Sequence, residues 1–121
     1  MAALVYVVDD EHLIATTLAK ILQNSGFEAV PFVDPLDALL AAESQTPDLL
    51  ITDVMMPQLN GVDLGVQFKA IHPKCKVLLF SGHSAHVEKL HEARSQGHNF
   101  ELLTKPIHPK DLLAAIKEIT A

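Results

Sequence analysis

The chain has 121 residues, 49% of them apolar, and a formal net charge of −6 at pH 7. Its length suits one domain with its own core, and we expect a single domain over residues 1–121. The negative charge argues against a direct nucleic-acid-binding role. No apolar run is long enough for a membrane span, and no basic segment resembling a signal peptide precedes the first one. The single cysteine, Cys75, cannot form an internal disulfide, so we expect a soluble cytoplasmic protein.

The first two predicted strands are each followed by a helix. The apolar run Leu4–Val8 predicts the first strand, and an amphipathic segment after it predicts a helix that stops before Gly26. The second strand is expected at residues 28–33. Asp34 and Pro35 follow it as a capping residue and a first-turn proline, which predict the start of the second helix.

The middle of the chain repeats this alternation. A third strand is expected at residues 49–52, followed by a helix over about residues 61–71 that His72 and Pro73 end. The fourth strand is expected at residues 76–80. The helix after it, between residues 84 and 97, has the weakest apolar stripe of all.

A strand at residues 100–104 and a helix from about Pro109 complete the pattern. Alternating strands and helices predict an α/β doubly wound, flavodoxin-like fold with a five-stranded parallel sheet and five helices. The first, third and fourth strands are nearly continuous apolar runs, as buried central strands are. Pro31 in the second strand and Glu101 in the fifth favour the sheet edges. A strand order of 2-1-3-4-5 puts both of these strands at the edges, and this is the order that we predict.

Polar residues follow four of these strands. Asp9 and Asp10 follow the first strand, Asp53 the third, Ser81 the fourth and Lys105 the fifth. Ligands of open parallel sheets bind beyond the carboxyl ends of the strands, so we expect these side chains to lie together. Three carboxylates, a hydroxyl and an ammonium suit a divalent cation and a phosphoryl group.

The residue types match phosphoryl-transfer chemistry. Magnesium prefers oxygen ligands, and Asp10 and Asp53 could bind it directly, with Asp9 acting through a water. A bound cation would relieve the repulsion among the three carboxylates. A carboxylate can attack phosphorus and form an aspartyl phosphate. Lys105 would hold the phosphoryl oxygens, and Ser81 would donate a hydrogen bond to one of them.

Two further residues bear on this site. Gly82 has no side chain to obstruct a phosphoryl group. Pro106 could form a cis peptide bond with Lys105 that aims the lysine side chain, which the sequence alone leaves open.

Together these residues resemble the receiver domain of two-component response regulators. The resemblance covers essentially the whole chain. It is carried by Asp9-Asp10, by Asp53 with Pro57 and Gly61, by Ser81-Gly82 and by Lys105-Pro106.

The resemblance implies a role for each matched residue. Asp53 would accept a phosphoryl group from a phosphohistidine of a sensor histidine kinase or phosphotransfer protein. Mg²⁺ or Mn²⁺ would be held by Asp9, Asp10, Asp53 and the backbone carbonyl of Met55. Ser81, Gly82 and Lys105 would bind the phosphoryl group.

The resemblance also implies surroundings and partners. Met55 and His83 would flank the site and could tune the phosphoryl lifetime, or they could simply be exposed loop residues. The fourth helix, fifth strand and fifth helix would form a docking face for a downstream protein or output domain, or for a homodimer.

One position departs from the family pattern. The family often has an aromatic residue three positions before the lysine, where this chain has Leu102. Phe100 lies two residues earlier and is expected on the same strand face. We therefore expect movement of Ser81 to act through His83 and the fourth helix rather than through an aromatic side chain.

Two other functions stay open beside the preferred one. A haloacid-dehalogenase-like phosphatase also forms an aspartyl phosphate. The pattern of that class has a second Asp two residues after the nucleophile, where this chain has Met55. A degenerate receiver acting as a binding scaffold would not need the acidic triad and Lys105. The preferred function is a signalling switch that assists its own phosphorylation and slow dephosphorylation and is not a turnover enzyme.

Overall fold

The computed structural model describes residues 3–57, 59–82, 87–98 and 100–120. Its strands form one parallel sheet in the order β2-β1-β3-β4-β5. The flavodoxin-like fold and the strand order predicted from the sequence are therefore confirmed. The strands are β1 (Leu4–Val8), β2 (Glu28–Phe32), β3 (Leu49–Asp53), β4 (Lys76–Ser81) and β5 (Glu101–Thr104).

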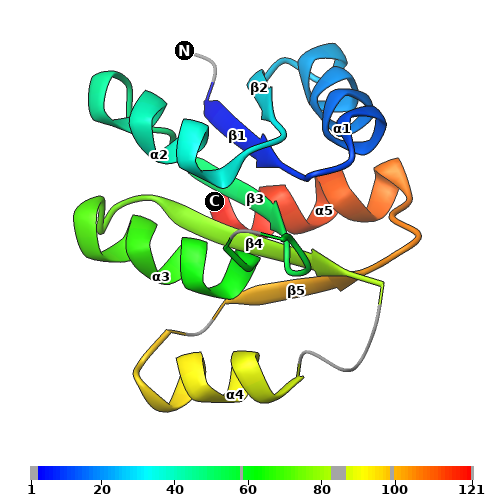
Figure 1. Cartoon of the computed structure of the whole chain (residues 1–121). Coiled ribbons are helices and arrows are strands. Elements are labelled where there is room, and N and C mark those ends of the chain that lie inside the picture. The colour runs from blue at the N-terminus through cyan, green and yellow to red at the C-terminus, as the bar shows by residue number, and fades with distance from the viewer. Residues whose placement is uncertain (1–2, 58, 83–86, 99, 121) are drawn as a thin grey trace.

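Helices cover both faces of the sheet (Figure 1). One face is covered by α1 and α5, and the other by α2, α3 and α4. The helices are α1 (His12–Asn24), α2 (Pro35–Ser44), α3 (Gly61–Ile71), α4 (Val87–Ser95) and α5 (Pro109–Thr120). Among the described residues, no helix combines the length and apolar character needed to traverse a lipid bilayer.

Alternate residues of the central strands supply two separate cores. In β1, Val5 and Val7 pack with α1 and α5, whereas Tyr6 and Val8 pack toward α2 and α3. All five residues of β1 and all five of β3 are buried, as expected of strands covered on both faces. The two buried layers cover both faces of the sheet, and the site lies at the carboxyl ends of its strands.

The two strands that contain residues disfavoured in the centre of a sheet lie at its edges. Pro31 lies in β2 and Glu101 in β5, and each strand has a neighbour on one side only. Proline lacks a donor for the sheet ladder, and the Glu101 side chain is exposed. The edge assignment made from these two residues is confirmed.

Several predicted boundaries differ by one residue. β3 and β4 each extend one residue further than predicted, so that Asp53 and Ser81 are the last residues of their strands. β2 ends at Phe32, one residue early. β5 begins at Glu101, one residue later than predicted, and Phe100 before it is buried in the cluster that includes residues of α3 and α4.

The fourth helix ends two residues before its predicted limit. It is described from Val87 to Ser95, and its predicted start at residue 84 lies outside the described residues. Gly97 has a φ of 93°, a conformation that glycine adopts without strain, which suits the reversal after the helix.

Candidate functional site

Three carboxylates meet at the carboxyl ends of β1 and β3, which are neighbouring parallel strands. One oxygen from each of Asp9, Asp10 and Asp53 lies within 4.8 Å of the others. Asp9 is fully buried and Asp53 is 5% exposed, whereas Asp10 faces solvent. The structure thus brings together the acidic residues that the sequence placed at separate strand ends.

Lys105 supplies the cation of this cluster. Its Nζ donates a hydrogen bond to Oδ2 of Asp53 at 3.3 Å and lies 3.7 Å from Oδ2 of Asp9. The backbone N–H of Lys105 donates to the carbonyl of Ser81 at 2.9 Å, which continues the β4–β5 ladder past the end of β5. The peptide bond between Lys105 and Pro106 is cis.

Phe80 lies under the ammonium group. The Nζ of Lys105 is 5.1 Å from the centroid of the Phe80 ring, within the range of a cation–π contact. Phe80 is fully buried in β4, so the ring forms a fixed floor for the lysine. Sequence reasoning missed this role, because Phe80 ends an apolar run and looks like an ordinary core residue.

Asp9 has the most perturbed carboxyl group of the site. Its Oδ1 accepts a hydrogen bond from the Glu11 N–H at 2.9 Å, but its buried Oδ2 has no hydrogen-bond partner among the described residues. Burial raises the pKa of Asp9 from 3.8 to about 6; the Glu11 N–H lowers it, the Asp53 charge raises it and Lys105 lowers it. A buried carboxylate oxygen in this state is suited to a cation or to a cation-bound water.

The donor set fits a hard divalent cation. Three carboxylates beside one ammonium leave excess negative charge in a small volume, and Mg²⁺ takes oxygen ligands and keeps several waters. Asp10 is open to solvent, so an ion with part of its hydration shell can approach from that side. Asp9, Asp10 and Asp53 are the side chains that could hold such an ion.

Asp53 is held from two sides. Its Oδ1 accepts a long hydrogen bond of 3.4 Å from the N–H of Met55, and its Oδ2 accepts the bond from Lys105. Thr52, which is buried, donates from its hydroxyl to the Asp53 carbonyl at 3.0 Å. The carboxylate is thus oriented toward Lys105 while its backbone is anchored in β3.

Gly61 allows the loop after Asp53 to fold back on the strand. A Cβ at Gly61 would collide with the carbonyl oxygen of Asp53 and lie 2.8 Å from its carbonyl carbon. The Gly61 N–H donates to the carbonyl of Val54 at 2.9 Å, and Asn60 caps α3 by accepting from the N–H of Asp63. In the sequence Gly61 served only as part of a family resemblance; its spatial role needed the structure.

The remaining predicted residues lie around this cluster. Ser81 is 3% exposed at the end of β4, in register with Thr104 of β5. Gly82 is exposed, and a Cβ there would lie 3.8 Å from Cδ of Lys105. The Met55 side chain is 55% exposed. His83 lies outside the described residues.

Comparisons with known proteins agree on one family. The model of the response regulator receiver domain matches residues 5–117. The transcriptional regulatory protein CreB of Escherichia coli is 33% identical over 115 residues, covering 95% of this chain and 49% of that protein. The alkaline phosphatase synthesis transcriptional regulatory protein PhoP of Bacillus subtilis is 30% identical, covering 95% of this chain and 47% of that protein. The chain spans about half the length of these relatives.

Solved structures give the same answer. A receiver domain protein from Clostridium thermocellum has a TM-score of 0.86 at 29% identity, covering 97% of this chain and 93% of that one. The chemotaxis protein CheY4 of Vibrio cholerae has a TM-score of 0.88 at 26% identity, covering 98% and 99%. The carboxylate and lysine cluster thus lies in a chain that belongs to the receiver domain family of two-component response regulators.

Proposed function

We propose that this receiver domain is a switch controlled by phosphorylation of Asp53. The phosphoryl group would come from a phosphohistidine on a sensor histidine kinase or phosphotransfer protein in the cytoplasm. The observation that carries the proposal is the position of the Asp53 carboxylate, between two further carboxylates and the ammonium of Lys105.

The chemistry follows from these positions. An oxygen of Asp53 attacks phosphorus, a new P–O bond forms and the imidazole nitrogen of the donor leaves with the electrons of the broken P–N bond. The Nζ of Lys105, 3.3 Å from Oδ2 of Asp53, then donates its hydrogen bond to one phosphoryl oxygen in place of Oδ2. The Ser81 hydroxyl donates to a second phosphoryl oxygen. When bound by Asp9, Asp10, Asp53 and the Met55 carbonyl, Mg²⁺ or Mn²⁺ supplies charge neutralisation.

Phosphorylation would be communicated through the strand ends. Ser81 and Lys105 are joined by a backbone hydrogen bond of 2.9 Å. A shift of either residue would therefore move the ends of β4 and β5 together. Leu102, in the middle of β5, is 36% exposed, and no aromatic ring occupies its position. The face formed by α4, β5 and α5 is the proposed docking surface for a downstream partner or a second copy.

A turnover phosphatase is the weaker alternative. The sequence pattern of such enzymes has a general acid two residues after the nucleophile. In this chain that position is Met55, whose thioether cannot donate a proton. The proposed switch turns over only through slow loss of its own phosphoryl group. A binding scaffold is also weaker, because it would not require the ammonium of Lys105 to lie 3.3 Å from Asp53 and 3.7 Å from Asp9.

Intact-mass spectrometry after incubation with acetyl phosphate and Mg²⁺ tests the proposal. The wild type should gain one phosphoryl group, whereas Asp53→Asn and a metal-free sample with chelator should not. Asp37→Asn, which changes an exposed carboxylate on α2, is the matched control and should be labelled like the wild type. Equal labelling of Asp53→Asn and the control would disprove the assignment.

A further inference from the structure

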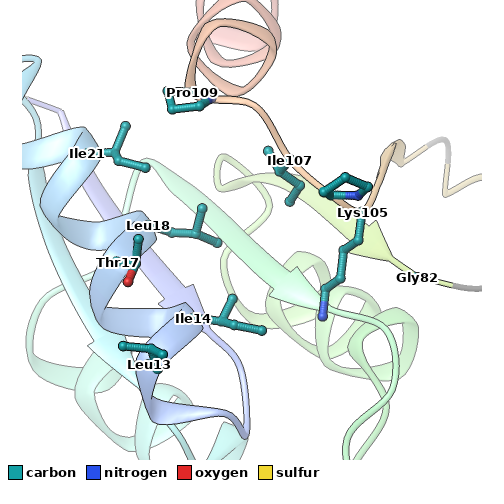
Figure 2. Close-up of a pocket in the computed structure, with 10 residues that line it drawn as sticks. Leu13, Ile14, Thr17, Leu18, Ile21, Gly82, Lys105, Ile107 and Pro109 are labelled. Atoms are coloured by element: carbon teal, nitrogen blue, oxygen red, sulfur yellow. The ribbon is translucent and has the colours of Figure 1, made fainter.

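An aliphatic groove opens beside the proposed phosphorylation site. It has a volume of about 730 Å³ and lies between α1 and the segment that leads from β5 into α5. Figure 2 shows Ile14 and Leu18 pointing from α1 toward the segment that carries Lys105 and Ile107. The lining of the groove therefore combines Lys105, whose Nζ lies 3.3 Å from Asp53, with a row of aliphatic side chains.

The lining has an uneven chemistry. Among the described residues that line it, Lys105 is the charged one, and most of the other side chains are aliphatic. Leu13, on the first turn of α1, is 77% exposed at the groove. A single molecule filling both parts would need an anionic group for Lys105 and an aliphatic tail for the rest.

We propose that the groove receives the aliphatic tail of an acyl phosphate, which makes butyryl and hexanoyl phosphate better phosphodonors than acetyl phosphate. This inference rests on the proposed phosphorylation of Asp53 and adds a selection among acyl phosphates by the length of the tail. The phosphoryl group would contact Lys105, and the acyl carbons would lie along Leu13, Ile14 and Ile107.

The transfer balances without any further reactant. An oxygen of Asp53 attacks the phosphorus of the acyl phosphate and forms the new P–O bond. The bond between phosphorus and the bridging oxygen breaks, and the carboxylate leaves with its electron pair. One mixed anhydride of a carboxylic and a phosphoric acid replaces another, so no oxidant, reductant or proton is consumed.

Second-order labelling rate constants for acetyl, butyryl and hexanoyl phosphate test this inference by intact mass. Full burial of a methylene is worth about fourfold in binding, and an open groove covers only part of each, so we expect hexanoyl phosphate to react about tenfold faster than acetyl phosphate. Leu13→Gln should reduce this ratio to about threefold or less. Leu40→Gln alters a leucine that is 63% exposed on α2, outside the groove, and should keep the wild-type ratio.

A non-transferring competitor gives an independent measurement. Hexyl phosphate has the tail and the phosphoryl group but no anhydride, and it should slow labelling by acetyl phosphate at lower concentration than methyl phosphate does. Equal inhibition by the two alkyl phosphates would overturn the inference.

The outcomes separate this inference from the proposed function. Phosphoramidate has no acyl tail, so labelling of Asp53 by phosphoramidate with equal rates for all three acyl phosphates overturns only the groove assignment. After that result, a protein that carries the phosphohistidine would be the remaining candidate for binding in the groove. A chain on which no donor labels Asp53 overturns both proposals.

Discussion

Oδ2 of Asp9 and Nζ of Lys105 are separated by 3.7 Å, which is too long for a hydrogen bond. The Nζ of Lys105 is nearer to Asp53, at 3.3 Å, so its electrostatic attraction to Asp9 is the weaker of the two. Asp9 is fully buried, and the charge on its carboxylate is therefore poorly compensated without a metal ion. The consequences of this arrangement can be measured.

Asp9→Asn should stabilise the metal-free protein at neutral pH. The substitution keeps an oxygen that can accept from Glu11 and removes a buried charge, so we expect a gain of about 1–3 kcal/mol in the free energy of unfolding. Urea unfolding with chelator present measures this gain. Asp10→Asn, at an exposed position, is the control and should change stability by less than about 0.5 kcal/mol. A destabilised Asp9→Asn protein would contradict the prediction.

The same carboxyl group should make stability depend on pH. The native pKa of about 6 exceeds the ordinary 3.8, so the folded state binds the proton more tightly than the unfolded state. The resulting penalty is fully present above about pH 6 and is relieved as the pH falls toward 4. The stability difference between wild type and Asp9→Asn should therefore shrink between pH 7.5 and pH 5. A difference that stays constant over this range would argue against a perturbed Asp9, and saturating Mg²⁺ should abolish the pH effect.

Gly61→Ala should be strongly destabilising. Its methyl group would meet the backbone of Asp53, which is anchored in the central sheet and cannot give way, so we expect a loss of about 2 kcal/mol or more. Gly82→Ala is the matched control, because its Cβ would lie at an ordinary contact distance of 3.8 Å from Lys105. Thermal unfolding of the two variants compares them directly. Similar melting temperatures would mean that the loop after Asp53 relaxes more easily than the packing indicates.

Lys105→Met should separate the two roles of the lysine. Methionine has a comparable length but no charge, so labelling by acetyl phosphate should slow by at least about tenfold. Mg²⁺ affinity should rise in the same variant, because the ammonium no longer competes for oxygens of Asp9 and Asp53. Calorimetric titration measures the affinity, with Lys110→Met, an exposed position on α5, as control. Weaker metal binding in Lys105→Met would show that the lysine supports the metal site instead.

Much of the fold could be predicted because the residue types within each strand restrict where that strand can lie in the sheet. Pro31 and Glu101 are tolerated at sheet edges, and the apolar runs around Val7 and Leu50 require cover on both faces. These restrictions placed β2 and β5 at the edges, in agreement with the observed order. The meeting of Asp9, Asp10, Asp53 and Lys105 followed from the general geometry of parallel sheets.

Other features depend on contacts between distant residues and left no local signal. Phe100 was predicted as the first residue of the fifth strand, but it lies before β5 and is buried in the cluster that includes residues of α3 and α4. The Phe80 ring under Lys105 joins residues of different strands. The groove beside Leu13 exists only because α1 and the start of α5 lie side by side on the same face of the sheet.

Oδ2 of Asp9, which has no hydrogen-bond partner among the described residues, has a consequence for the lifetime of the protein. A domain with a poorly compensated buried charge in its metal-free site is expected to open more readily than the same domain with a cation bound there. Occupied molecules would then resist cellular proteases better than empty ones. Cellular abundance would then depend on whether the site holds a cation.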